Sequence, residues 1–286
     1  MRFAIEQDPI RVANIQDDLA QRHGTIMQSR GTLLRYETAE LPNAFPRLSR
    51  MLDGSDYRAQ FQGLYYHIES EDRRIERLIP AGEYYEFVFR AVADKRHALQ
   101  LGLDRVAELE RWVQRYYHEI RDPALREALP SHRVVDHVYA LKSELGNILI
   151  VVRGGLDCIA TLFHFLYGPE SAWLTSLTDF TKDLDQSYRQ GVDTDPEMRA
   201  YLAQQLAWFR TLEEYHDYVT HFGSIDITFY EPEEGVVRTY LQDALAVHEI
   251  VAPVLSGFDA FCDFIDGHFA ARIEQSPLHS REAVSV

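Results

Sequence analysis

At 286 residues, with 46% hydrophobic and 26% charged residues, the chain has the length and composition of a globular protein that can bury a substantial core. Its formal net charge of −16 argues against a protein that binds nucleic acid by charge alone, because neutralising phosphates requires clustered Lys and Arg. From Val192 onward the sequence has 17 Asp and Glu, 5 Arg and no Lys, so we expect a basic protein partner or RNA held at a local basic patch.

The first residues, M-R-F-A-I-E-Q-D-P-I, lack the apolar run and small-residue cleavage site of a signal peptide, which favours a cytoplasmic protein. Cys158 and Cys262 lie within apolar helical patterns and without metal-ligand spacing, so we interpret both as buried thiols. The sequence has no glycine-rich phosphate loop, nucleophile elbow or zinc-type cluster. We therefore expect neither a metal ion nor a cofactor.

The N-terminal segment, residues 1–60, has mixed periodicity and predicts only a helix over 15–28. We interpret it as a cap or docking segment. From Ile68 the pattern becomes helical, with a short charged helix to Ile79 and a break at Pro80 and Gly82. A long helix is then predicted over residues 83–120.

The most apolar segment follows Ser131, a predicted N-cap, and runs to Tyr167. Its middle part is apolar nearly all round, which is typical of a central helix in a bundle. It is also long enough to cross a membrane, but Arg153 and Asp157 lie inside it and no basic loop flanks it. We therefore favour a core helix and expect no contact with a membrane.

The C-terminal part predicts a helix over residues 172–188, and then a helix that begins at Pro196 after an Asp195 cap and ends at Gly223. Two short alternating segments separated by E-P-E-E-G predict a β-hairpin. A last helix covers 244–273, and the tail, 276–286, is expected to be flexible. The prediction is an all-α bundle of five or six helices over residues 61–275, with a small β-hairpin after the helix that ends at Gly223.

The strongest chemical signal is Y-H-D-Y-V-T-H-F-G-S at residues 215–224, the end of a predicted amphipathic helix. His221 falls in the last turn, where the helix dipole favours a protonated imidazole. Asp217 and His221, at positions i and i+4, are expected to face each other. His216 and His221 are about 140° apart around the axis, so they cannot hold one ion without further ligands.

The sequence H-D-Y-V-T-H at residues 216–221 resembles the motif of the HEPN superfamily, an Arg and a polar residue followed by a His at the end of a bundle helix. Asp217 and His221 match this motif, and His216 stands where the family has Arg. The helical layout over residues 81–275 is similar as well. The resemblance implies a metal-independent ribonuclease whose site is assembled across a homodimer.

By this resemblance His221 is the candidate acid or base, and Asp217 orients it or organises the helix end. The phosphate contact falls to His216 or to Arg153, since imidazole is a poorer phosphate ligand than a guanidinium. Arg153 belongs to a narrow polar stripe on the central helix, and we hypothesise that this stripe faces the motif helix. The alternative is an Arg153–Asp157 ion pair that only fixes helix packing.

Two functions follow from these observations. The first is a HEPN-like protein with an altered ribonuclease motif, acting in stress or mobile-element defence as the resemblance implies. The second is a non-catalytic, antitoxin-like helical protein that binds a basic partner. A homodimer is expected because helical bundles commonly pair through exposed apolar strips.

Overall fold

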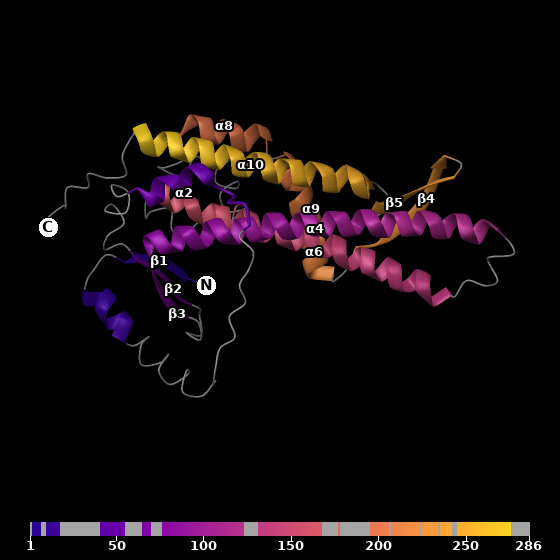
Figure 1. Cartoon of the computed structure of the whole chain (residues 1–286), viewed down its shortest axis with the longest axis horizontal. Coiled ribbons are helices and arrows are strands. Elements are labelled where there is room, and N and C mark those ends of the chain that lie inside the picture. Colours follow the sequence, from indigo (N-terminus) through magenta and orange to yellow (C-terminus); the bar gives the residue numbers. More distant parts are fainter. Residues whose placement is uncertain are drawn as a thin grey trace. The chain divides into compact units, whose positions relative to one another are not determined.

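A computed structural model describes residues 2–6, 10–17, 41–54, 65–69, 76–122, 131–167, 177, 195–205, 207–222, 225–233, 235–241 and 245–275. Helices account for most of these residues, which confirms the predicted all-α class (Figure 1). Besides a helical segment at 10–17, the helices are α2 (Pro46–Asp53), α4 (Ala81–Arg121), α6 (Ser131–Tyr167), α8 (Pro196–Gln205), α9 (Ala207–Phe222) and α10 (Val247–Gln275).

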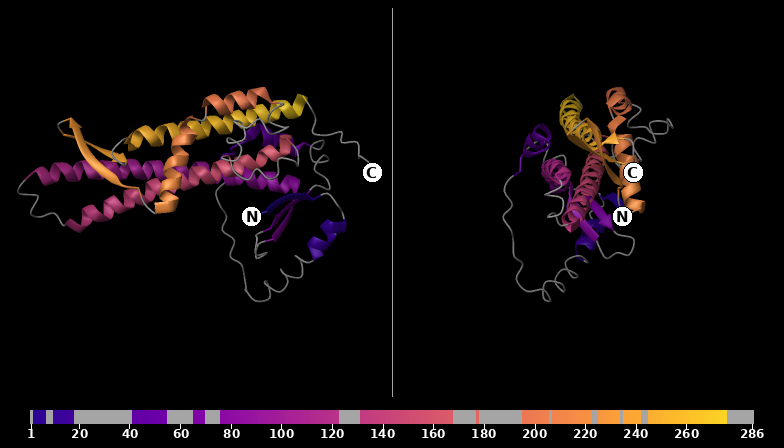
Figure 2. Two further views of the ribbon diagram at one scale, coloured as in Figure 1. Left: turned by 180° about the vertical axis from the view of Figure 1, so that it is seen from behind. Right: turned by 90° about the vertical axis from the view of Figure 1, so that its right-hand side faces the viewer.

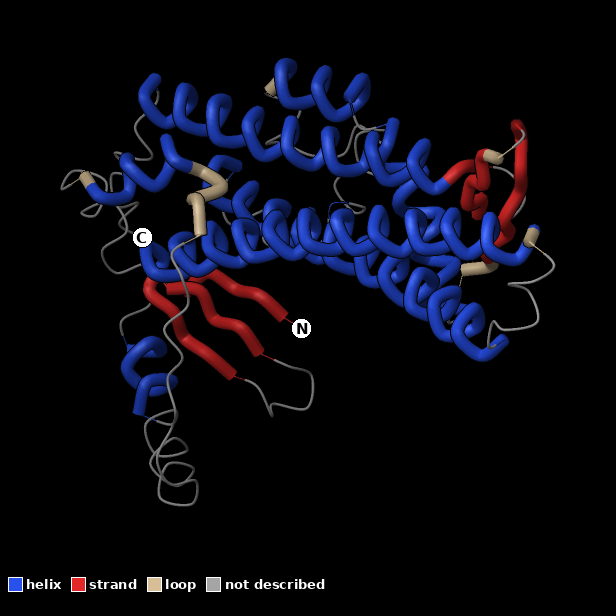
Figure 3. Tube along the Cα trace, turned by 45° about the vertical axis from the view of Figure 1, so that its right-hand side comes forward, coloured by secondary structure: helices blue, strands red, loops and turns tan. Residues whose placement is uncertain are grey.

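The described strands form two antiparallel sheets, which Figure 3 colours red. The first has the order β1-β2-β3, and the second β4-β5-β6. Their bounds are β1 (Arg2–Glu6), β2 (Tyr65–Glu69), β3 (Glu76–Pro80), β4 (Ile227–Glu233), β5 (Val236–Leu241) and β6 (Leu245–Ala246). The β4-β5 pair is the β-hairpin predicted after the motif helix, with Thr228 opposite Tyr240 and a bulge between Tyr230 and Glu233.

The short charged helix predicted from Ile68 to Ile79 is wrong, because its described residues, 68–69 and 76–79, belong to β2 and β3. Tyr65 pairs with Pro80, and Arg2 at the start of the chain pairs with Glu69. The closely spaced charges suggested a solvated helix, but pairing with a strand some sixty residues earlier decides the conformation. The first sheet was therefore missing from the prediction.

The long helices agree with the prediction, and α6 has its predicted bounds. The single helix predicted from Pro196 to Gly223 is instead divided into α8 and α9. The helix predicted at 172–188 lies outside the described residues except for Leu177, which is helical and buried. The tail and most of the predicted helix at 15–28 also lie outside them.

The chain divides into two compact units. Unit 1 comprises residues 1–93, 157–199 and 262–286, and unit 2 comprises residues 94–156 and 200–261. The helices α4, α6 and α10 contribute residues to both. The predicted domain boundary near residue 60 stays a prediction.

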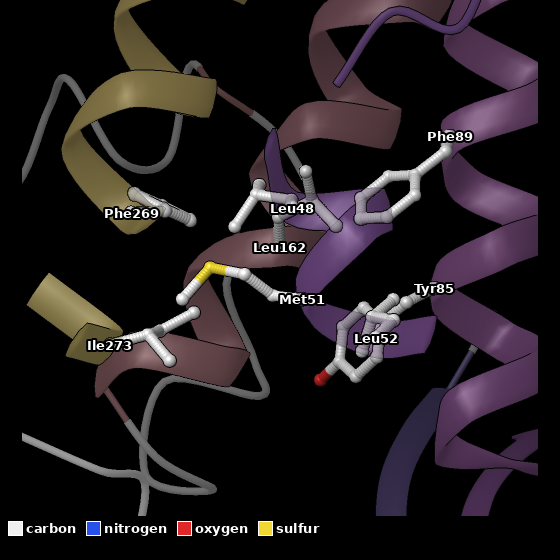
Figure 4. Close-up of a pocket in the computed structure, with 8 residues that line it drawn as sticks. All are labelled: Leu48, Met51, Leu52, Tyr85, Phe89, Leu162, Phe269 and Ile273. Carbon is white, nitrogen blue, oxygen red and sulfur yellow. The ribbon is translucent and has the colours of Figure 1, made fainter. Parts of the chain in front are cut away.

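Unit 1 has an aromatic core, in which Phe45 lies 5.2 Å from Phe89 and Phe163 lies 5.7 Å from Phe269, between ring centroids. The buried Asp266 of α10 accepts hydrogen bonds from the backbone N–H groups of Arg47 and Leu48, and so caps α2. Side chains of α2, α4, α6 and α10 surround a gap of only about 10 Å³ (Figure 4). This apolar gap has room for one water molecule at most, so it is a packing defect and not a ligand site.

The start of α8 confirms the predicted cap, since Oδ1 of Asp195 accepts a hydrogen bond of 3.1 Å from the backbone N–H of Met198. The other carboxylate oxygen lies 2.8 Å from Nε2 of the buried His268 and 3.5 Å from the Arg272 guanidinium. Asp195 is completely buried, so these partners offset the cost of removing its charge from water.

Unit 2 has close helix contacts at two glycines. A Cβ atom on Gly257 of α10 would lie 2.3 Å from the Trp208 ring, and one on Gly155 of α6 would lie 2.7 Å from the Phe258 ring. Any larger residue would therefore displace a ring.

Within α6, the span Val135–Phe163 contains an 18-residue window with a mean hydropathy of 1.6, and the helix could cross a membrane by length and composition. In that window 61% of the residues are buried within the protein, as expected for the core helix of a bundle.

Candidate functional site

The motif helix α9 is amphipathic, as predicted. Phe209, Leu212 and Tyr215 are buried on one side, and Asp217 and His221 are exposed on the other. Burial, and then the charge of Glu214, raises the pKa of Tyr215. His221 lies in the last turn, and α9 rests against α6, where Val219 meets Gly146 (Figure 2).

On α9, His216 is the histidine whose ring contacts a carboxylate. Its Nδ1 lies 3.2 Å from Oδ1 of Asp217, and its Nε2 lies 3.5 Å from the Thr220 hydroxyl. The side chain of His216 is 20% exposed and that of Asp217 61%. Asp217 thus contacts the neighbouring histidine, although the spacing had predicted a contact with His221.

His221 is exposed, and within the described residues it has no hydrogen bond or ion pair. The part of the chain that the structure describes therefore does not join the two histidines into one site. Of the predicted site residues on α9, only His216 and Asp217 come together.

Arg153 does face the motif helix, as hypothesised. Its Nη1 lies 3.7 Å from Oε1 of Glu213, and its guanidinium carbon lies 5.5 Å from the centroid of the Phe209 ring. The Arg153 side chain is only 14% exposed. Glu213 precedes His221 by eight residues, which is about 12 Å along the helix axis. Arg153 is thus placed beside the first half of α9, with its charge balanced by a carboxylate of that helix.

Other members of the polar stripe on α6 have separate partners. Nζ of Lys142 lies 3.3 Å from Oδ1 of Asp226, and Asp157 accepts a hydrogen bond from the backbone N–H of Leu177. The stripe therefore serves several contacts and does not form one polar site.

A second candidate region, which sequence reasoning missed, is an open hollow of about 760 Å³ in unit 2. We call it the arginine hollow, because Arg111 and Arg115 of α4 and Arg238 of β5 line it. The rest of its lining is Ala107, Glu108, Glu110, Gln114, Val237 and His248. The spacing of Arg111 and Arg115 at i and i+4 was a visible signal, but the approach of Arg238 required the fold.

The β4-β5 hairpin is fastened to α4 next to this hollow. Glu231 accepts hydrogen bonds from the Tyr117 hydroxyl, the Arg121 guanidinium and the backbone N–H of Gly235. Gln114 donates a hydrogen bond of 3.0 Å to the Gly235 carbonyl. The Tyr117 hydrogen bond is the main reason that the pKa of Glu231 is lowered, and the same bond raises the pKa of Tyr117.

Glu110 lies on the α4 side of the hollow. Burial raises its pKa, which a hydrogen bond with Thr239 and the nearby His248 partly oppose. Glu108 is held by Arg105, whose Nη1 lies 2.6 Å from its Oε2. Both acidic residues of the lining are therefore engaged by groups other than the three arginines.

Among the described residues, no group of three or more His, Cys, Asp or Glu is arranged to hold a metal ion. No family model, characterised protein or solved structure matches the chain. The resemblance to the HEPN superfamily therefore depends on the motif residues alone.

Proposed function

We propose that this protein is a HEPN-like helical bundle that acts by binding a basic macromolecular partner and does not cleave RNA. The observation that carries this proposal is the pairing of Arg153 with Glu213, 3.7 Å apart. Arg153 was the cation best placed to substitute for the family's arginine, and a carboxylate now balances its charge. A guanidinium held in this way is a poor ligand for a scissile phosphate.

The charge of unit 2 supports a basic partner. The exposed carboxylates in its C-terminal part are Glu214, Asp217, Asp226, Glu233 and Glu249. This excess of exposed carboxylates attracts a cationic protein, and the association is expected to weaken as salt screens the charges. In this proposal the protein is cytoplasmic and homodimeric, and it does not contact a membrane.

The second candidate is metal-independent RNA cleavage in stress or defence, and the His216–Asp217 contact favours it. A carboxylate next to an imidazole fixes its orientation, as acid-base catalysis requires. In this candidate His216 and His221 are the acid and the base, and the site is completed across the homodimer.

One experiment separates the two candidates. The purified protein is incubated with mixed RNA in excess EDTA and compared with His216→Ala, His221→Ala and the control His97→Ala, an exposed histidine of α4. We expect intact RNA with all four proteins. Cleavage by the wild type and by His97→Ala that falls by a factor of about 10² or more in the other two variants would establish the ribonuclease instead.

Partner binding is tested by capture from a lysate at low and high salt, with identification by mass spectrometry. We expect a basic protein that is released by salt and retained less by Glu214→Gln/Glu233→Gln. The matched control is Glu83→Gln/Glu86→Gln, which removes the same charge from α4 in unit 1. Equal capture by both double variants would contradict an acidic docking surface on unit 2.

A further inference from the structure

The arginine hollow brings cations together from two separate elements. Arg111 and Arg115 lie one turn apart on α4, and Arg238 projects from β5, opposite Tyr230 in the hairpin. The volume of about 760 Å³ lies within the range of about 300–1,000 Å³ that is usual for small-molecule sites. Size alone therefore permits a ligand.

The three arginines differ from those cations of this chain that carboxylates hold. Arginines that lie within 4.0 Å of a carboxylate include Arg90, Arg96, Arg105, Arg121, Arg153 and Arg272. For Arg111, Arg115 and Arg238 no ion pair occurs within the described part of the chain. Arg111 uses only Nε, which donates a hydrogen bond to the Ala107 carbonyl. The chain has a net charge of −16, so carboxylates are plentiful. Three guanidinium groups that line one hollow and form no ion pair with a described carboxylate therefore suggest an external anion.

The acidic residues of the lining oppose an anion less than their number suggests. Glu108 is paired with Arg105, which lies outside the hollow. Glu110 is partly buried, and its raised pKa reflects an environment that disfavours its charged form. Three guanidinium groups against one such carboxylate leave the hollow positive, although the protein as a whole is strongly negative.

The backbone at Arg238 is held beside α4 before any ligand arrives. The contacts of Tyr117, Arg121 and Gln114 with the hairpin fasten β5 beside α4. Thr239, the next residue, is buried and faces Glu110. Binding therefore orders the arginine side chains but does not need to bring β5 to α4.

The lining indicates the class of ligand. Guanidinium forks match phosphate oxygens in pairs of hydrogen bonds, so three of them suit a group with two or three linked phosphates. Among the described residues of the lining, His248 alone has a ring, and none has the larger aromatic ring on which bases usually stack. We propose that the arginine hollow binds a small molecule that carries an oligophosphate group, recognised by its charge.

The test uses sodium tripolyphosphate and isothermal titration calorimetry at about 0.1 M salt in EDTA. The wild type is compared with Arg115→Gln/Arg238→Gln and with the control Arg90→Gln/Arg210→Gln, which removes the same charge at exposed sites outside the hollow. We expect one site per chain, roughly tenfold weaker binding for each hollow arginine removed, and a control within about twofold of the wild type. No binding by the wild type, or an equal loss in both double variants, would overturn the proposal.

Two further measurements keep the outcome clear. Labelling of wild-type arginines by a dicarbonyl reagent, read by mass spectrometry, should be blocked by tripolyphosphate at Arg115 and Arg238 but not at Arg90 or Arg210. This readout does not depend on the folding of a variant. If a short single-stranded RNA displaces tripolyphosphate and binds more tightly, the ligand of the hollow is RNA and the small-molecule proposal is wrong. Neither result bears on capture of a basic partner, which uses Glu214 and Glu233.

Discussion

The motif end of α9 and the arginine hollow lie in the same unit and differ in a useful way. The first resembles a known motif in sequence, but its residues do not come together: His221 is exposed, His216 contacts Asp217, and Arg153 lies 3.7 Å from Glu213. The second has no recognisable motif, yet it places three guanidinium groups around one cavity.

In this chain, the positions of charged groups and their partners indicate an anion site better than the motif does. At α9 the Glu213 carboxylate balances the Arg153 guanidinium, and Asp217 contacts His216. At the hollow, three guanidinium groups have no ion-pair partner among the described residues. An anion would therefore gain more from the hollow than from α9.

The largest expected effect is at Arg153. If the Arg153–Glu213 pair holds α6 against α9, Arg153→Met leaves a partly buried carboxylate without its cation and should lower the free energy of unfolding by about 2 kcal/mol. Arg153→Met/Glu213→Leu should recover most of that loss. Urea denaturation of the two single variants and the double variant gives the coupling energy directly.

The double-mutant cycle of Arg153 and Glu213 also tests whether the charge of Arg153 is used within the protein. Additive effects of the two substitutions would mean that the pair contributes nothing, and would return Arg153 to the list of candidate phosphate ligands. Tripolyphosphate affinity in the double variant should equal that of the wild type, because neither residue lines the arginine hollow.

The sequence predicts the long helices well, because α4, α6 and α10 carry apolar periodicity over many turns. Local signals also predict the Asp195 cap and the β4-β5 hairpin. The first sheet was missed because β1 lies some sixty residues before β2, and no local pattern records that pairing.

The candidate sites follow the same logic. That Arg153 faces the motif helix could be predicted from the polar stripe on α6, but its pairing with Glu213 depends on how α9 rests against α6. The i, i+4 arginines of α4 were readable in the sequence, whereas Arg238 comes from a strand about 120 residues later. Sites that combine distant elements appear only in the fold.

A smaller effect is expected at the tip of the hairpin. Gly235 has a φ of +81°, a conformation that costs other residues roughly 1 kcal/mol, so Gly235→Ala should lower the free energy of unfolding by about that amount. The Gly235 N–H donates a hydrogen bond to Glu231 and its carbonyl accepts one from Gln114, so a strained backbone at this residue should loosen β5 and weaken tripolyphosphate binding. Thermal unfolding and calorimetry measure the two effects, with Gly82→Ala as control, since a Cβ there meets nothing within 4 Å. Unchanged binding would mean that the hairpin does not position Arg238.

The smallest effect concerns Glu110, and its sign is opposite to that of an ordinary surface carboxylate. Burial raises its pKa above the ordinary value of 4.5, so the folded protein binds this proton more tightly than the unfolded chain. The stability that the proton provides is complete below about pH 4.5 and is lost as the pH rises through the raised pKa of the folded state.

Glu110→Gln has no such loss and can still accept the Thr239 hydrogen bond, so its gain in unfolding free energy over the wild type should grow between pH 4 and pH 7. Urea denaturation across that range measures the trend, with Glu119→Gln, an exposed carboxylate of the same helix, as control. The same variant should bind tripolyphosphate more tightly at pH 7, because it removes a carboxylate that lines the hollow together with the three arginines. A gain in stability without a gain in affinity would separate Glu110 from the anion site and leave it as a buried group of the α4–β5 contact alone.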